Sequence, residues 1–509
     1  MAPSDKVCPI SGCASWPALK LDYCFVQRAH VGKQLHLVGS EGMGLVTDHK
    51  YALLLTISKA YGWPKQPDAG LVRFRNGRLS DEVVAGRLRQ SWESRSDEVA
   101  LLLTGCGAVE TMNDQLVSVL QELCGKVIGK ATPSVGASPK LNPSAGKMYF
   151  HLVRDVLSLD KDNGPLFSDD ERRTGLEEAA DVLAERYLAA QLVERGWYEQ
   201  TEPAQPPADW SFTVEEVRAE VARQDASRAC GGDGIHIRVL KTLGTTSFAN
   251  VLTSLYNACL ETRTTPDAWR STDIQLIVKD YNNPKTIANA RPISLICMFR
   301  KVFEGCLLRR MQALPCFGLH PAQAGFREEY STLTLAGVIN IALEQRLCLG
   351  VIFLDFSAAF DMVNHSLLGE KLRERACPAD ILEVLMSLTA ENRSRVLANG
   401  GASRSFLRTR GVLQGAPTSP LLWNVLVDDL VCALNEGKHG LPNGVFYADD
   451  GAILYTDEAD IPMLLAKVEA WCDRNGIAVN VRKCSYITRA FGGQPVCWRG
   501  VAIPRVEEY

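Results

Sequence analysis

Three aspartates in the second half of the chain have the surroundings expected of a metal-dependent site. Asp355 lies near the end of Gly350 to Phe356, an apolar run of β-forming residues that predicts a strand buried on both faces. Asp449 and Asp450 separate two further apolar runs, which predicts a hairpin with an acidic tip. If these strands share one sheet, three carboxylates converge, and such oxygen ligands hold Mg²⁺ together with substrate phosphates.

The acidic tip also has a plainer interpretation, which its own sequence supports equally well. Asp-Gly between two apolar runs is the commonest signal of a hairpin turn and needs no catalytic role. The acid in the other strand favours a site, because a carboxylate in a buried strand is costly unless it has a partner. Two Mg²⁺ ions about 4 Å apart would then activate a hydroxyl nucleophile and stabilise a leaving pyrophosphate.

A polar loop could place substrate-binding groups near these acids. Gln414 and Gly415 lie in a turn-rich segment before a helix, which we expect to begin with Ser419 as N-cap and Pro420 as its first residue. The bare glycine backbone beside a polar side chain would let a base pair approach closely. The alternative is a capped core helix with no further role.

Positive charges between the predicted strands could bind a triphosphate or a nucleic-acid backbone. Lys279, which follows the strand-like run Ile274 to Val278, and Arg291 are candidates to grip a triphosphate through charge-assisted hydrogen bonds, or else surface charges. A longer basic segment has two interpretations that the sequence supports equally: a nucleic-acid-binding stripe and a solvated helix face. This segment contains Arg291, Arg300, Lys301, Arg309 and Arg310.

The elements that must position these residues mix helices with short apolar strands, which indicates the α+β class. Segments 131–146 and 200–209 are rich in Pro, Ser or Gly and predict linkers. Helical spacing runs from Met112 to Lys126 and from Leu176 to Leu188, and we expect the second helix to pack on the later part of the chain. The part from Trp210 onward holds nearly all the chemistry.

Composition excludes several classes of protein. The 509 residues are 46% apolar and 22% charged, enough for several domains with cores and too apolar for bulk disorder. The 16 cysteines are scattered among apolar neighbours, which predicts reduced core residues. No apolar run is long enough to span a bilayer and no signal peptide is evident, so we expect an intracellular protein that does not bind a membrane. The net charge of −4 does not exclude a nucleic-acid partner.

The first forty residues contain a further set of metal-binding residue types. Cys8, Cys13, His30 and His36 have a spacing that resembles a Cys-Cys-His-His zinc finger, in which four such ligands form a tetrahedral Zn²⁺ site. The central spacing is longer than usual. The alternative is that the cysteines are structural and the histidines lie on a helix face.

From about residue 160 to the end, the chain resembles the reverse transcriptases of non-LTR (LINE-type) retrotransposons. The resemblance is specific because the blocks occur in the family's order with sensible spacings. The blocks are Gly231 to Ile235, Lys279, Arg291 to Leu295, Gln323 to Arg327 with Ser331 and Thr332, Leu354 to Asp361, Gln414 to Pro417 with Ser419 and Pro420, Tyr447 to Asp450, and Asn480 with Lys483.

The resemblance implies roles for individual residues. Asp355 and Asp449 become the principal metal ligands and Asp450 a third, less direct carboxylate, while Lys483 assists the departure of pyrophosphate. Phe360, a bulky aromatic residue, is expected to block the 2′-hydroxyl of an incoming ribonucleotide; the alternative is a core phenylalanine. Substrate-binding roles fall to Lys279, Arg291, Gln414, Gly415 and Tyr447.

The implied protein is a right-hand polymerase of the α+β class, with fingers and an antiparallel palm sheet in residues 210–509. Three regions precede it: the possible zinc finger (1–40), an unassigned region (41–148), and a helical extension with a linker (149–209). We expect an RNA template, a DNA primer or target DNA, dNTPs, two Mg²⁺ ions and a nuclear location. The sequence ends near the expected start of the thumb, which leaves two alternatives: a truncated copy of an element, or a chain that works with a thumb or endonuclease supplied in trans.

Two other functions stay open. An RNA-templated RNA polymerase is disfavoured by Phe360 and by Tyr-Ala-Asp-Asp, since those enzymes more often have Gly-Asp-Asp. A catalytically impaired remnant of a transposable element would keep RNA and DNA binding, through the zinc finger and the basic segment, without polymerisation.

Overall fold

The computed structural model divides the chain into two compact units. Residues 1–66, 134–166 and 278–289 form the smaller unit, and residues 67–133, 167–277 and 290–509 form the larger one. Within the described residues, no helix is both long enough and apolar enough to cross a membrane. The described residues are 35–39 and 51–55 (backbone only), 74–104, 108–130, 172–188, 210–279, 287–327, 337, 339, 340, 344, 350–398, 401–437, 442–489 and 494–507.

In the smaller unit, strand β1 (Leu35–Gly39) pairs antiparallel with β2 (Tyr51–Leu55). The backbone of His36 lies in β1, whereas Cys8, Cys13 and His30 lie outside the described residues. The zinc finger therefore stays a prediction. Both predicted linkers, 131–146 and 200–209, also lie outside the described residues.

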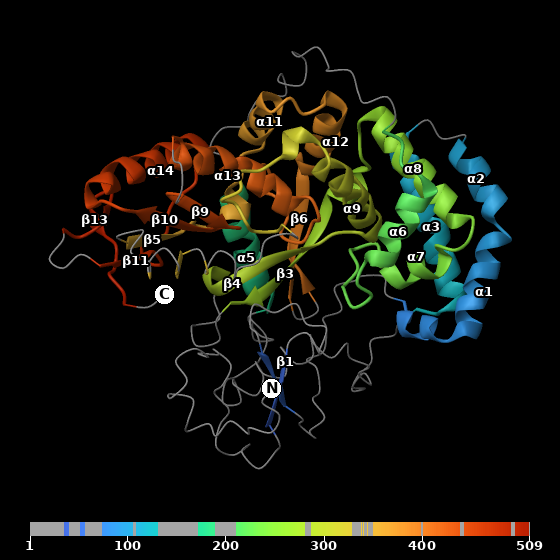
Figure 1. The fold of residues 1–509 in the computed structure, drawn as a ribbon. Helices are drawn as coiled ribbons and strands as arrows, with labels where there is room; N and C mark the ends of the chain where they lie inside the picture. Colours follow the sequence, from blue (N-terminus) through green and yellow to red (C-terminus); the bar gives the residue numbers. More distant parts are fainter. Residues whose placement is uncertain are drawn as a thin grey trace, which may run out of the picture. The chain divides into compact units, whose positions relative to one another are not determined.

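A four-stranded antiparallel sheet in the larger unit contains the predicted carboxylate strands. Its order is β11-β5-β10-β9, so β5 lies between two partners. The predicted strand and hairpin are both confirmed, and helices α13 and α14 lie along one face of the sheet (Figure 1). The bounds are Gly350–Asp355 for β5, Gly444–Tyr447 for β9, Asp450–Tyr455 for β10, Ser485–Thr488 for β11, Ser419–Asn435 for α13 and Ile461–Asn475 for α14.

A second, five-stranded sheet has the order β4-β3-β6-β7, with β8 also paired to β6. Strand β3 runs parallel to β6, and β8 antiparallel to it. The predicted strand 274–278 is confirmed as part of β3. With both sheets and the surrounding helices, the described chain is of the α+β class. The bounds are Ser271–Val278 for β3, Ala290–Leu295 for β4, Asn392–Ala398 for β6, Gly401–Ala402 for β7 and Phe406–Arg408 for β8.

Helices from the N-terminal third pack within the larger unit, on helices that follow residue 230 (Figure 1). The indole of Trp92 is fully buried, contacts Phe248 edge-on and donates a hydrogen bond to Ser247. The helix predicted for residues 112–126 is confirmed as α3. The bounds are Glu82–Glu93 for α1, Ser96–Thr104 for α2, Val109–Val127 for α3, Ile237–Leu243 for α7 and Phe248–Thr262 for α8.

Helix α5 (Arg172–Tyr187) confirms the second predicted helix and packs on β6, β7 and β8, as expected. Leu188 lies just past its end and is exposed. The remaining described helices are α6 (Val214–Arg223), α9 (Met298–Gln312), α11 (His365–Glu374) and α12 (Ala379–Thr389), with short 3-10 turns η4 (Asn76–Ser80), η6 (Asp267–Arg270), η7 (Ile287–Asn289), η8 (Pro315–Phe317), η9 (Ala359–Met362) and η10 (Glu458–Asp460), and a hairpin of β12 (Cys497–Trp498) and β13 (Val501–Ala502).

The basic residues on α9 form neither the predicted continuous nucleic-acid stripe nor a uniformly solvated helix face. Arg300 and Lys301 are both buried, whereas Arg309 is exposed. Arg309 and Arg310 form ion pairs with Glu220 and Glu216 of α6. The prediction failed because the acids that neutralise these arginines lie about ninety residues earlier in the chain, where spacing along one helix cannot reveal them.

Helix α13 begins one residue earlier than predicted, with Thr418 rather than Ser419 as its N-cap. The Thr418 hydroxyl does not cap the helix but donates to the fully buried carboxylate of Glu304 at 2.6 Å. The same carboxylate accepts from the Thr418 amide and from Arg300, its neighbour on α9. This buried network joins α9 to the start of α13.

We predict that Glu304→Ala lowers the free energy of unfolding by about 3 kcal/mol or more, because it leaves Arg300 buried without its carboxylate partner. Urea unfolding monitored by circular dichroism measures the change. The exposed Glu370 on α11 provides a control, and Glu370→Ala should stay within about 0.5 kcal/mol of the parent protein. Equal unfolding midpoints for both variants would contradict a stabilising role of this network.

Candidate active site

The strand register brings two of the three predicted acids directly opposite each other. In the β5–β10 ladder, Asp450 pairs with Asp355, and in the β9–β10 ladder it pairs with Tyr447. Asp449 precedes Asp450 in the exposed turn between the strands. Opposed residues in an antiparallel ladder have their side chains on the same face, about 5 Å apart at Cβ.

The turn itself differs from the predicted Asp-Gly turn. Asp450 is already the first residue of β10, so the turn is centred on Ala448 and Asp449. Ala448 has a φ of 57°, in the left-handed region that non-glycine residues seldom adopt. The left-handed residue is therefore Ala448, next to the exposed Asp449, whereas in an ordinary Asp-Gly turn a glycine would adopt positive φ without strain.

The charges at this end of the sheet act on one another. The pKa of Asp450 is raised to about 6, first by loss of solvent around its carboxyl group and then by the negative charges of Asp449 and Asp355. Lys483 opposes this shift, and its Nζ lies 3.7 Å from Oδ2 of Asp355. The described residues contain no group of three or more His, Cys, Asp or Glu side chains that could hold a metal ion.

Lys483 reaches Asp355 because the segment before β11 runs along the end of β5. The amide of Asn480 donates to the carbonyl of Asp355, and the amide of Ser357 donates to the carbonyl of Ala478, both at 2.8 Å. These backbone bonds hold the two predicted residues, Asn480 and Lys483, beside the first carboxylate. Their spacing along the chain alone could not show this neighbour.

A loop from far earlier in the sequence supports the acidic turn. The amide of Ala324 donates to the carbonyl of Phe446, and Gly325 lies so close to Ala448 that a Cβ at this glycine would overlap the Ala448 backbone. From the other side, the Trp423 indole donates to the carbonyl of Ala448 at 2.9 Å. Trp423 was not among the predicted site residues, because its apolar neighbours indicate only a core position.

Phe360 contacts two other aromatic rings. It stacks on the buried Trp423 and lies tilted against Phe326, with ring centroids 6.0 Å apart in each pair. Phe326 is 51% exposed, so the aromatic group reaches from the core to the surface. Phe360 is thus neither a simple core residue nor a free surface side chain.

The predicted substrate loop is joined to the five-stranded sheet and to η9. The carbonyl of Gln414 accepts from the amide of Ser294 in β4, and the amide of Val412 donates to the carbonyl of Phe360. Gly415 has a φ of 128°, and a Cβ there would lie 2.8 Å from the Ser294 carbonyl oxygen. Glycine is therefore required at this position for conformational and for steric reasons.

Two predicted phosphate-binding residues are not part of the four-stranded sheet. Arg291 is exposed in β4, within the five-stranded sheet. Lys279 directly follows β3 and belongs to the smaller unit, where its amide donates to the carbonyl of Asn289. The described contacts do not bring either residue to the carboxylates.

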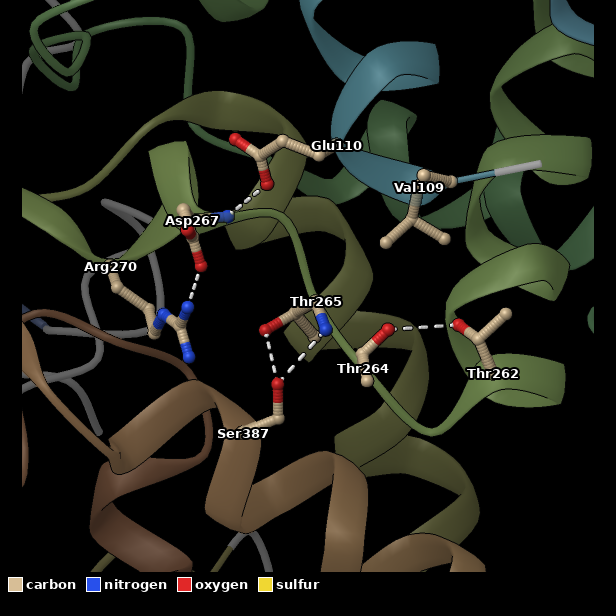
Figure 2. A pocket seen from close by; sticks show the side chains of 9 residues that line it. Val109, Glu110, Thr262, Thr264, Thr265, Asp267, Arg270 and Ser387 are labelled. Carbon is tan, nitrogen blue, oxygen red and sulfur yellow. Dashed lines mark hydrogen bonds and ion pairs between the residues drawn. The ribbon is translucent and has the colours of Figure 1, made fainter. Parts of the chain in front are cut away.

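A separate pocket of about 430 Å³ lies between α3, α8 and α12 (Figure 2). Its hydroxyls bond one another, as in the pair Thr265 and Ser387 at 2.8 Å, and Arg270 pairs with Asp267. Glu110 accepts from the amide of Asp267. Since its polar groups are already engaged with one another and the predicted acids do not line it, this pocket is not the candidate active site.

Comparison with protein families places the carboxylates in a known context. Residues 282–503 match the sequence model of the family described as "Reverse transcriptase (RNA-dependent DNA polymerase)". This range includes both strands of the acidic hairpin, β5, and the loop with Gln414.

Curated relatives are similar over a larger part of the chain. The Pol polyprotein of the type-1 retrotransposable element R2 from Popillia japonica is 29% identical over 48% of this chain and 35% of the relative. The RNA-directed DNA polymerase from mobile element jockey of Drosophila melanogaster is 28% identical over 55% of this chain and 32% of the relative. The probable RNA-directed DNA polymerase from transposon BS, also from Drosophila melanogaster, is 27% identical over 60% of this chain and 36% of the relative. The chain spans about a third of the length of these relatives.

We predict that Gly325→Ala destabilises the protein by about 1 to 3 kcal/mol, because the new methyl group must displace the turn at Ala448. Gly86, inside α1 with open space around it, is the matched control, and Gly86→Ala should stabilise the protein by up to about 1 kcal/mol. Thermal unfolding of both variants tests this. A Gly325→Ala protein as stable as its parent would show that the loop does not contact the turn.

Proposed function

We propose that this chain, whose residues 282–503 belong to the reverse transcriptase family, is an RNA-directed DNA polymerase of a non-LTR retrotransposon. Its reaction would extend the 3′ end of a DNA primer on an RNA template with dNTPs. The observation that supports this most directly is the register that places Asp450 opposite Asp355, with Asp449 in the adjoining turn. An ordinary acidic hairpin turn would not require a third acid, Asp355, on the neighbouring strand β5 opposite Asp450.

The donor set fits Mg²⁺. The pKa of Asp450 is raised by burial and by the negative charges of Asp449 and Asp355, and such repulsion at one strand end favours a bound cation. Magnesium is commonly held by one or two carboxylates with substrate phosphates and water as the other ligands, so a complete protein cage is not needed. We propose Asp355 and Asp449 as the principal ligands and Asp450 as the third. Bound Mg²⁺ would supply activation of the primer hydroxyl and neutralisation of phosphate charge.

The other residues would act on the nucleotide. Lys483, whose exposed side chain lies beside Asp355, would give a proton to departing pyrophosphate. Phe360, which contacts two other rings, would exclude a 2′-hydroxyl, and Gln414, Gly415 and Tyr447 would contact the incoming nucleotide or its base pair.

The wider assignments extend the same proposal. The four-stranded sheet would be the palm, and the region with the five-stranded sheet would belong to the fingers, with Lys279 and Arg291 on the triphosphate. Copying into target DNA implies a nuclear location and, for the N-terminal cysteines and histidines, a DNA-docking zinc finger.

We predict that Asp449→Ala abolishes primer extension, with a loss of at least about 10³-fold, because a principal metal ligand is removed. The assay contains the full chain, a primed RNA template, Mg²⁺ and either dNTPs or NTPs. Asp97→Ala, which removes an exposed aspartate of α2, should extend as the parent does.

Three results would overturn the proposal in different ways. Extension with NTPs alone would indicate an RNA polymerase, and RNA binding without extension would indicate a non-catalytic remnant. Undiminished extension by Asp449→Ala would remove Asp449 from the site while leaving the polymerase activity in place.

We predict that Phe360→Ala raises ribonucleotide incorporation relative to dNTP incorporation by roughly tenfold or more, because the 2′-hydroxyl would no longer meet a ring. Single-nucleotide extension with each substrate measures the ratio. Phe212→Ala removes another buried ring and should lower stability without changing selectivity. An unchanged ratio in Phe360→Ala would assign Phe360 to the core alone.

A further inference from the structure

A fourth aspartate lies next to the candidate active site and is not one of the three proposed metal ligands. Asp361, in η9, is only 1% exposed. Its carboxylate accepts hydrogen bonds from Gln414 Nε2 at 2.9 Å and from the Tyr187 hydroxyl at 3.3 Å, and it lies 3.5 Å from Arg186 Nη1. A buried carboxylate is stable only with such partners, and one of them is a proposed nucleotide-binding residue.

Gln414 is fixed at two points. Its carbonyl accepts from the amide of Ser294, and its side-chain amide nitrogen donates to Asp361. An ionised carboxylate accepts hydrogen bonds and cannot donate, so it selects the orientation in which Nε2 faces Asp361. The oxygen Oε1 and the second N–H of Gln414 then keep a defined direction for another ligand.

Helix α5 holds the other side of Asp361. The ring of Tyr187 is fully buried and lies 3.7 Å from the guanidinium carbon of Arg408. The carbonyl of Tyr187 accepts from the amide of Thr409, and the carbonyl of Arg186 accepts from Arg410 Nε. The end of α5 therefore fastens the strand that leads directly into the loop with Gln414.

Close backbone packing completes this arrangement. Gly411 has a φ of 87°, and a Cβ there would lie 2.7 Å from the carbonyl oxygen of Asp361. Its amide donates to the carbonyl of Val363 at 2.7 Å. The Gln414 loop and η9 thus have little freedom to move apart, and the Asp361–Gln414 bond joins two already adjacent segments.

We propose that Asp361 is a positioning residue that orients the Gln414 amide for the incoming nucleotide, and that Arg186 and Tyr187 of α5 hold Asp361 in place. The inference rests on the proposed polymerase function, since it assigns a role within that site. It also extends the site to α5, which lies outside the family match at residues 282–503. A carboxylate is required because asparagine, with a donor and an acceptor, permits either orientation of the glutamine amide.

The test is a double-mutant cycle on steady-state primer extension with the full chain. Asp361→Asn, Gln414→Ala and the double variant are compared for the KM of the incoming dNTP and for kcat. We expect each single variant to raise the KM about tenfold, as for the loss of a hydrogen bond to a charged group, with a smaller change in kcat. The double variant should be no worse than Gln414→Ala alone, because Asp361 acts through Gln414.

Two further variants separate positioning from folding. Asp428→Asn changes another buried aspartate, which pairs with Arg375 and contacts neither Gln414 nor α5, so it should lower stability without raising the KM. Tyr187→Phe removes one donor to Asp361 and should raise the KM about two- to threefold, an effect that Gln414→Ala also masks. It tests the proposal even if Asp361→Asn does not fold.

The outcomes are distinguishable. If the parent protein extends primers but the KM increase of Asp361→Asn, or of Tyr187→Phe, multiplies with that of Gln414→Ala in the double variant, the positioning role is overturned. Loss of stability with an unchanged KM would assign Asp361 to the fold alone. A parent protein that does not extend primers would overturn the proposed function, and the inference with it.

Discussion

The register between β5 and β10 is the constraint on which the site depends. β5 is buried on both faces, so burial of apolar residues alone does not distinguish the observed register from a one-residue slip. The register is distinguished by glycines that face aromatic rings across the ladders. Gly350 faces Tyr455 across one ladder and Gly451 faces Phe446 across the other, and in each pair the ring occupies the space where a Cβ would lie. A slip would bring side chains into that space and separate Asp355 from Asp450.

Backbone hydrogen bonds, more than side-chain contacts, connect this sheet to the remainder of the site. The segment with Lys483 is held along the end of β5, the loop at Ala324 is held against β9, and the Gln414 loop is held both by η9 and by β4. Buried backbone groups need hydrogen-bond partners, so these bonds hold the segments in place, and Gly325, Gly411 and Gly415 provide the close approach that the bonds require. The chemistry can then be set by a few side chains at fixed positions.

Local sequence patterns predicted the elements of the site but not how they meet. The strand ending at Asp355, the acidic hairpin and the helix after Gln414 each follow from periodicity and turn residues within about fifteen positions. The partners of Arg309 and Arg310 lie on a distant helix, and the hydroxyl of Thr418, at the N-cap of α13, bonds the buried Glu304 on α9. The contact of Trp423 with Ala448 is equally non-local. Such pairings depend on the tertiary fold, and a single sequence gives no signal for them.

The extent of the family match is not the physical boundary of the folded unit. Helices α1 to α3 and α5 precede residue 282, yet α1 to α3 contribute side chains to the main core of the larger unit, and α5 buries apolar side chains beside β6, β7 and β8. Trp92 and Tyr187 are each fully buried against residues from later segments, and truncating an aromatic side chain in such a position commonly costs about 3 to 5 kcal/mol. That loss is comparable to much of the stability of an ordinary domain. The segment 282–503 alone would therefore expose apolar surface that the native chain covers, and the residues that hold Gln414 would lose their support from α5.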